Sequence, residues 1–176
     1  MAVYAIAAGH TKDKSAGSGA TFNGWSESEI ARRIASEVIV GLRRRGHTVH
    51  NCTVDKAQTQ QAYLEKTCQL ANESGAGIAV FIHLNASAKH TGSGAEVYSW
   101  RGERLPQAVG VCNELQKLGF KNRGVKDGSG LYVVKHTTMT ALLIEVFFID
   151  GVEDRALYQK HGAAGVAAAI MKGLLS

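Results

Sequence analysis

The chain has 176 residues, of which 45% are hydrophobic and only one is proline. This length and composition fit one globular domain with a substantial core, and they exclude a repeat or low-complexity protein. Lys and Arg number 20 against 15 Asp and Glu, and the resulting net charge of +5 favours polyanionic surroundings, of which nucleic acid and an anionic cell wall are examples. No nucleic-acid-binding motif accompanies the charge, so we do not expect nucleic acid as a partner.

The cysteines and the first residues bear on the compartment. Cys52, Cys68 and Cys112 are an odd number and lack Cys-x-x-Cys spacing, which argues against a disulfide framework and a cysteine zinc site. We expect three buried thiols. The first apolar run is preceded by no basic segment and is too short for a signal peptide or a membrane span, so we expect synthesis in the cytoplasm and no membrane insertion.

The first predicted strand is Val3–Ala8, an apolar run that leads directly to His10. Residues 11–24 are rich in Lys, Ser, Gly and Asn and predict a surface loop of the kind that lines a site. His10 thus lies at the junction between a strand and such a loop, which makes it a candidate ligand.

A helix is predicted to begin at Ser26 and to stop at Gly46, because apolar residues recur every four positions between them. Ser26 and Glu29 fit the S-x-x-E capping box, in which the acid reaches back to the first residue of the helix. This assigns a structural task to Glu29 and leaves Glu27 available for function. Stabilisation of the helix dipole is the alternative for Glu27.

Residues 48–53 predict a short strand, and Asp55 with Gln58 predicts the start of a helix that ends near residue 74. A continuous apolar run, rich in β-branched residues, follows at residues 78–82 and is typical of a strand buried on both faces.

His83 closes that run. Ligands in open α/β sheets gather beyond the carboxyl ends of the strands, so His83 is a candidate metal ligand. A core histidine hydrogen-bonded to a neighbour is the alternative.

Residues 95–99 predict a further strand, and a helix follows from about Arg104 to Gly119. Residues 121–130 predict a basic, glycine-rich loop, and residues 131–134 predict a short strand.

Residues 141–149 form an apolar run in which Glu145 is the only charged residue. Burial of an unpaired charge costs several kcal/mol, so Glu145 must meet a cation, a metal-bound group or water in a cleft. We favour a functional role for it, with a structural salt bridge as the alternative. A helix over Val152–Leu174 closes the chain.

Taken in order, these stretches resemble the zinc-dependent N-acetylmuramoyl-L-alanine amidases of the amidase-3 type, which cleave peptidoglycan. The resembling segments are Ala-Gly-His at 8–10, Glu27 placed 19 residues before Gly46, Ile-His-Leu-Asn-Ala-Ser at 82–87, Arg-Gly-Val-Lys at 123–126 with Leu-Tyr-Val-Val after it, and Leu-Ile-Glu-Val-Phe-Phe at 143–148. Together they span nearly the whole chain. The family usually has a proline shortly before the catalytic strand, where Thr140 stands here, and we expect this difference to affect only the local turn.

The resemblance implies that His10, Glu27 and His83 bind one zinc ion and that Glu145 is the catalytic acid. Two imidazoles and one carboxylate are a ligand set of hydrolytic zinc enzymes, in which water takes the fourth position. The implied reaction is hydrolysis of the amide bond between the lactyl group of N-acetylmuramic acid and L-alanine of peptidoglycan, with Glu145 transferring the proton to the leaving amine.

Asn85 and the basic segment at Arg123 are candidate substrate-binding residues. The expected fold is a single-domain three-layer α/β/α fold with a mostly parallel or mixed central sheet. We expect residues 1–176 to be one catalytic domain without a separate wall-binding domain, acting on the bacterial cell wall after release. The alternatives are another zinc peptidase or carboxypeptidase acting on wall peptides, and a non-enzymatic wall-binding module. The sequence leaves the oligomeric state open.

Overall fold

A computed structural model of the protein describes residues 1–12 and 16–176. Its central sheet has six strands, and a two-stranded hairpin lies beside it. The sheet consists of β1 (Val3–Ala8), β4 (Thr48–Asn51), β5 (Ile78–Asn85), β6 (Ala95–Ser99), β7 (Asn122–Asp127) and β8 (Thr140–Phe148), and the hairpin of β2 (Thr21–Phe22) and β3 (Trp25–Ser26). The helices are α1 (Glu27–Arg44), α2 (Gln60–Glu73), α3 (Pro106–Lys117), α4 (Tyr132–Lys135) and α5 (Val152–Leu174), with a 3₁₀ turn at Trp100–Gly102.

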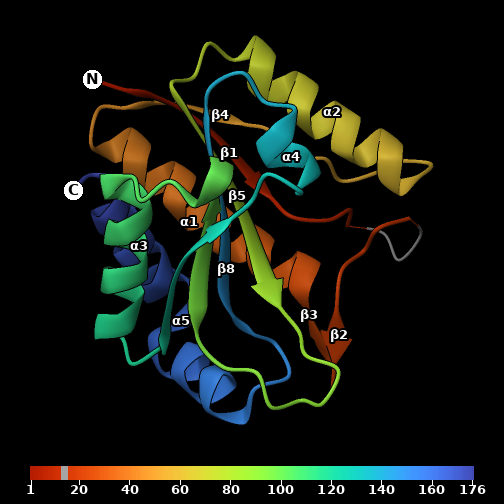
Figure 1. Ribbon diagram of the computed structural model, residues 1–176, viewed down its shortest axis with the longest axis vertical. Helices are drawn as coiled ribbons and strands as arrows, with labels where there is room; N and C mark the ends of the chain where they lie inside the picture. The colour runs from red at the N-terminus through yellow and green to blue at the C-terminus, as the bar shows by residue number, and fades with distance from the viewer. Residues whose placement is uncertain (13–15) are drawn as a thin grey trace.

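The sheet is mixed, with the strand order β4-β1-β5-β8-β6-β7. Its neighbouring strands are parallel except for β6 and β8, which are antiparallel. The long helices α1, α3 and α5 cover one face, and α2 with the short α4 covers the other (Figure 1). This confirms the predicted three-layer α/β/α fold.

The three strands at the centre of the sheet are apolar along nearly their whole length because each packs against helices on both sides. Side chains pointing toward α1, α3 and α5 form the larger core, and those pointing toward α2 and α4 form a smaller one. All three cysteines are buried and carry free thiols, as predicted. Within residues 1–12 and 16–176, every helix falls short of the length and hydropathy needed to cross a bilayer.

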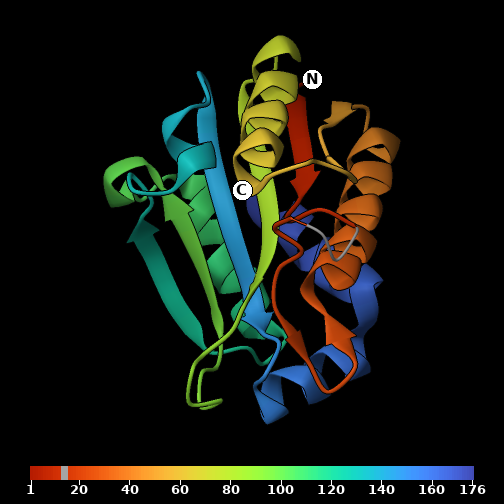
Figure 2. The same cartoon turned by 90° about the vertical axis from the view of Figure 1, so that its right-hand side faces the viewer.

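The parallel pairing of β1 with β5 brings the two histidines to one edge of the sheet. Ala8 pairs with Ile82, so His10 and His83 follow neighbouring strands in the same direction. Figure 2 shows these strands side by side with β8, in which Glu145 stands opposite His83. A register shift follows this pair, since the next paired residues are Asn85 and Phe148. Such bulges re-aim side chains and are frequent beside active sites.

The helix α1 begins directly after Ser26, as predicted, whereas the capping box at its start and the predicted start of α2 were wrong. Ser26 precedes α1 in an extended conformation, but its side chain makes no capping hydrogen bond, so the proposed box with Glu29 does not form. The α2 helix begins after Thr59, whose hydroxyl accepts a hydrogen bond from the backbone N–H of Ala62 at 3.0 Å. Asp55 instead forms an ion pair with Arg32.

Two other predicted elements were also wrong. The segment predicted as a basic loop contains β7, an edge strand whose polar side chains give no apolar pattern and whose backbone pairs with β6. The apolar run at residues 131–134, predicted as a strand, contributes to the helix α4, where Val133 and Val134 are buried. A run of four apolar residues fits either structure, because periodicity needs a longer window. Thr140 begins β8 in register with Ile78, so strand pairing is intact where the proline was expected.

Candidate metal centre

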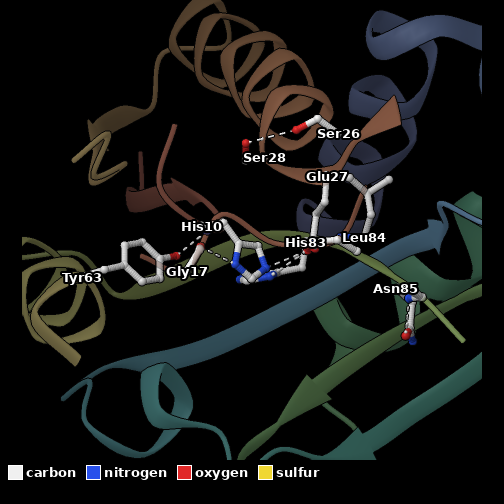
Figure 3. Close-up of polar contacts among 12 residues, drawn as sticks. His10, Gly17, Ser26, Glu27, Ser28, Tyr63, His83, Leu84 and Asn85 are labelled. Carbon is white, nitrogen blue, oxygen red and sulfur yellow. Dashed lines mark hydrogen bonds and ion pairs between the residues drawn. The ribbon is translucent and has the colours of Figure 1, made fainter. Parts of the chain in front are cut away.

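The structure brings together the three residues predicted to be metal ligands. His10 follows β1, Glu27 is the first residue of α1, and His83 lies near the end of β5. One ligand atom from each lies within 4.8 Å of the other two. Figure 3 shows the two imidazole rings converging on the Glu27 carboxylate, which reaches down from the first turn of its helix.

A single carboxylate oxygen lies between the two imidazoles. Glu27 Oε1 is 3.0 Å from His10 Nε2 and 3.3 Å from His83 Nδ1. The two rings are edge to face, with centroids 4.8 Å apart. Two imidazole nitrogens and a carboxylate oxygen at such spacing match the donor set of a three-ligand zinc site.

The orientation of His10 is fixed from two sides. Its Nδ1 lies 2.8 Å from the carbonyl oxygen of Gly17, which can only accept, so Nδ1 carries a proton and Nε2 points to Glu27. Its backbone N–H donates to the hydroxyl of Tyr63 at 2.7 Å. Such a contact from the second ring nitrogen to a carbonyl sets the tautomer of a metal-binding histidine.

Glu27 is held by backbone groups as well as by the imidazoles. Its carboxylate is buried and accepts hydrogen bonds from the N–H groups of Ala20 at 2.8 Å and Leu84 at 3.1 Å. Burial by itself would raise the pKa of Glu27, but hydrogen bonds from His10 and His83 outweigh burial and lower this pKa well below its usual range. Glu27 is therefore a carboxylate at neutral pH.

The hydrogen bond between Glu27 and His10 lowers the pKa of Glu27 and raises the pKa of His10. Burial would lower the pKa of His10, but the hydrogen bond and charge of Glu27 outweigh burial and raise it. His10 is therefore protonated more readily in the metal-free protein, and a protonated His10 forms an ion pair with Glu27. Since a histidine must lose its proton to bind a metal, metal affinity should fall as the pH falls.

Glycine backbone packs directly against the three candidate ligands. A Cβ atom on Gly9 would lie 2.4 Å from the His83 ring, and one on Gly19 would lie 2.7 Å from both Glu27 Oε2 and the His10 ring. The ligands consequently have little room to move away from one another.

The Gly9→Ala variant is expected to bind zinc about 10- to 100-fold more weakly, the range typical of lost supporting contacts around a metal, because the new methyl group displaces His83. Gly77→Ala is the matched control, since a Cβ there would meet nothing within 4 Å. Zinc dissociation constants from competition with a chelator give the comparison. Equal affinities for Gly9→Ala and the unmodified protein would contradict the close packing.

The cluster opens into a cavity of about 360 Å³. Its polar lining includes His10, Glu27, His83, Asn85 and Glu145, and its apolar lining includes Leu64, Leu131, Val133 and Leu143. A ligand in this cavity would meet the three clustered residues and Glu145 at once.

Glu145 faces this cavity from β8. Its Oε2 atom is buried and has no hydrogen-bond partner in the described part of the chain, and none of the ion pairs there involves Glu145. Burial, followed by the negative charges of Glu27 and Glu96, raises the pKa of Glu145 to about 8. A carboxyl group with such a pKa can both accept and donate a proton near neutral pH.

Asn85 and Arg123 both donate hydrogen bonds to Glu96, a residue to which the sequence analysis assigns no role. Asn85 Nδ2 donates to Glu96 Oε1 at 2.9 Å, and Arg123 Nε donates to Glu96 Oε2 at 2.7 Å. Glu96 is buried in β6 directly opposite Glu145. The signal that pointed to Glu145, a carboxylate within an apolar strand, was also present for Glu96 at residues 95–99.

The Arg123 guanidinium is further fixed by the Phe148 ring, over whose centroid it lies at 5.0 Å. Of the two predicted substrate-binding residues, Asn85 lines the cavity directly. Arg123 is joined to Asn85 through Glu96.

Known protein sequences and solved structures are similar to this chain. The model of a protein family described as N-acetylmuramoyl-L-alanine amidase matches residues 5–176. The endolysin of Bacillus phage SPP1 is 30% identical over 152 residues, which are 81% of this chain and 54% of the endolysin. The N-acetylmuramoyl-L-alanine amidase LytC of Bacillus subtilis is 26% identical over 159 residues, which are 85% of this chain and 31% of LytC.

Among solved structures, the catalytic domain of the CD27L endolysin targeting Clostridia difficile superposes with a TM-score of 0.87 at 28% identity. The match covers 99% of this chain and 97% of that domain. The chain spans about half of the SPP1 endolysin and about a third of LytC, so the similarity concerns one part of each.

Proposed function

The chain belongs to the amidase-3 family of N-acetylmuramoyl-L-alanine amidases, and on that basis we propose that it is a zinc hydrolase that cleaves peptidoglycan. The bond cleaved is the amide between the lactyl group of N-acetylmuramic acid and L-alanine. The observation that carries this proposal is the convergence on one cavity of three ligand-type side chains and of Glu145, whose buried Oε2 atom has no hydrogen-bond partner among the described residues.

The residues fit zinc by their chemistry. Two imidazoles and one carboxylate are a donor set of catalytic zinc sites, which keep one position open. His10 already donates its other ring N–H to Gly17, and Glu27 is ionised. When bound, zinc supplies a Lewis acid that polarises a carbonyl oxygen and lowers the pKa of a water molecule to about 7.

Glu145 is the proposed general base and general acid. As a carboxylate it accepts the proton of the water that attacks the lactyl carbonyl carbon. It then donates this proton to the nitrogen of L-alanine as the amide bond breaks, and it is regenerated in its ionised form. Its pKa is raised to about 8 in the metal-free protein, and the charge of a bound zinc ion would lower it toward the ionised form that the first step needs.

Asn85 and Arg123 are proposed to orient the substrate. Asn85 Nδ2 gives one hydrogen bond to Glu96, which holds the amide in place and leaves its second N–H for a ligand. In the described part of the chain, the hydrogen bond of the Arg123 guanidinium is made by Nε, so its Nη groups remain available for a polar or anionic group of the stem peptide. We further propose that residues 1–176 act as one catalytic unit on the bacterial cell wall.

Purified peptidoglycan tests this function directly. The protein with zinc is expected to lower the turbidity of a wall suspension, and removal of the metal by a chelator should abolish this until zinc is restored. The products should carry new amino-terminal alanine and a freed muramic lactyl group. New termini elsewhere in the stem peptide would indicate a peptidase, and chelator-insensitive binding without any release would indicate a wall-binding module. Either result would contradict the proposal.

A further inference from the structure

The side chain of Arg32 joins three segments that meet at the metal centre. Arg32 lies in the second turn of α1, and its side chain is 17% exposed. Its guanidinium makes five contacts: Nε with Asp55 Oδ1 at 3.0 Å, Nη1 with the carbonyl oxygens of Gly9 at 3.4 Å and Ser28 at 2.9 Å, and Nη2 with the carbonyl oxygens of His10 at 2.9 Å and Val54 at 3.2 Å. A guanidinium has five N–H groups, so this number of acceptors matches its full donor capacity.

These acceptors belong to the backbone around two of the three ligands. Gly9 and His10 are the turn that carries the His10 imidazole, and Ser28 directly follows Glu27. Arg32 therefore connects the turn after β1 to the first turn of α1, independently of the contact between the ligand side chains.

The backbone of His10 needs such support. Its φ of 64° lies in the left-handed region, which costs a residue with a Cβ atom on the order of 1 to 3 kcal/mol unless surrounding contacts hold it. The His10 N–H donates to Tyr63, and the His10 carbonyl accepts from Arg32, so the peptide groups on both sides of its Cα are held. A lysine could not replace these contacts, because an ammonium has three donors on one atom.

We propose that Arg32 is a positioning residue of the metal centre. It holds the backbone of His10 against the helix turn that carries Glu27, and so sets the spacing of two ligands before the metal binds. This inference rests on the proposed zinc function.

The contacts and the charge of Arg32 predict opposite effects of its substitution on zinc affinity. A fixed cation near a metal site repels the metal, so loss of the charge alone would strengthen zinc binding. Loss of the contacts would weaken it. Arg32→Ala removes both the charge and the contacts, whereas Arg32→Lys keeps the charge and loses most of the contacts.

The test is the zinc dissociation constant of the metal-free protein, measured by competition with a chelator and accompanied by the absorption spectrum of the cobalt-substituted protein. We expect both Arg32→Ala and Arg32→Lys to bind zinc about 10- to 100-fold more weakly, and their cobalt spectra to change. Asp55→Asn, which weakens only the contact to Nε, should show a smaller loss. Arg33→Ala is the matched control, because Arg33 is the exposed neighbour on the same helix and its removal changes the charge equally.

Circular dichroism establishes whether each variant is folded. If Arg32→Ala does not fold, the two single variants Arg32→Lys and Asp55→Asn are sufficient for the test. Unchanged or tighter zinc binding by folded Arg32 variants would overturn the positioning role while the zinc function stands. An equal loss of zinc affinity in Arg33→Ala would also overturn the positioning role. The same holds if the Arg32 variants show a lowered melting temperature but an unaltered zinc affinity and cobalt spectrum. If the unmodified protein and Arg33→Ala both fail to bind zinc, the proposed function itself falls.

Discussion

The His83→Ala variant is expected to lose zinc and, with it, the release of stem peptide from peptidoglycan. His83 is one of the three proposed zinc ligands, and its Nδ1 also lies 3.3 Å from Glu27 Oε1, so its removal would affect a second proposed ligand. The affinity for zinc should fall by more than the roughly 10- to 100-fold that a lost supporting contact costs. The fold should persist, because His83 lies at the cavity, outside both hydrophobic cores.

The measurement is zinc content after dialysis against a weak chelator, with wall-lysis rates on the same samples. His50→Ala serves as the control, since His50 is an exposed histidine on the edge strand β4. The control should keep stoichiometric zinc and full activity. Retention of zinc by His83→Ala at the level of the control would remove His83 from the ligand set.

The sequence predicts the centre of this fold better than its edges. The strands β1, β5 and β8 are buried on both faces, so their apolar runs are unambiguous. At the edge of the sheet, β7 is polar because only its backbone is needed for pairing. The apolar run that includes α4 is too short for its period to distinguish helix from strand.

The candidate site was predictable where a polar side chain interrupts or ends an apolar strand. This holds for His10, His83 and Glu145. Glu27 is a candidate from the sequence partly because a capping box would occupy Glu29, and the structure contradicts this box. What distinguishes Glu27 from Glu29 is tertiary: its carboxylate meets the N–H groups of Ala20 and Leu84, which no local pattern encodes.

Arg32 illustrates the same limit. Its partners lie up to 23 positions away along the chain, and in the sequence it is one of two adjacent arginines on a helix. Only the fold shows that Arg32 turns toward the metal centre while Arg33 is exposed to solvent.

The Glu145→Gln variant is expected to keep zinc and lose turnover. Glutamine has nearly the same shape as glutamate but cannot take up or deliver the catalytic proton. Loss of a general acid and base costs on the order of 10² to 10⁴ in rate. Zinc content should be unchanged, because Glu145 is outside the cluster of His10, Glu27 and His83. Lysis rate and zinc content are measured on the same preparation, with Glu29→Gln, a change at an exposed acid of α1, as the control.

The same variant should be more stable than the unmodified protein, and the gain should depend on pH. Burial and the charges of Glu27 and Glu96 raise the pKa of Glu145 from its ordinary 4.5 to about 8 in the folded, metal-free protein. Below pH 4.5 the side chain is protonated in both the folded and the unfolded state, so the titration does not affect stability there. Between these two pKa values the unfolded state releases the proton more readily than the folded state. As the pH rises through this range, the free energy of unfolding of the unmodified protein therefore falls by on the order of 1 kcal/mol per pH unit.

Glutamine is neutral at every pH and avoids that loss. In the presence of chelator, the melting temperature of Glu145→Gln should therefore exceed that of the unmodified protein at pH 7, and the difference should disappear as the pH falls below about 4.5. A carboxylate kept for catalysis at the expense of stability accounts for this result. A structural carboxylate predicts the opposite, because its removal would leave a buried partner unpaired. A melting temperature at pH 7 that is lower for Glu145→Gln, together with retained lysis, would make Glu145 structural and refute its role as proton carrier.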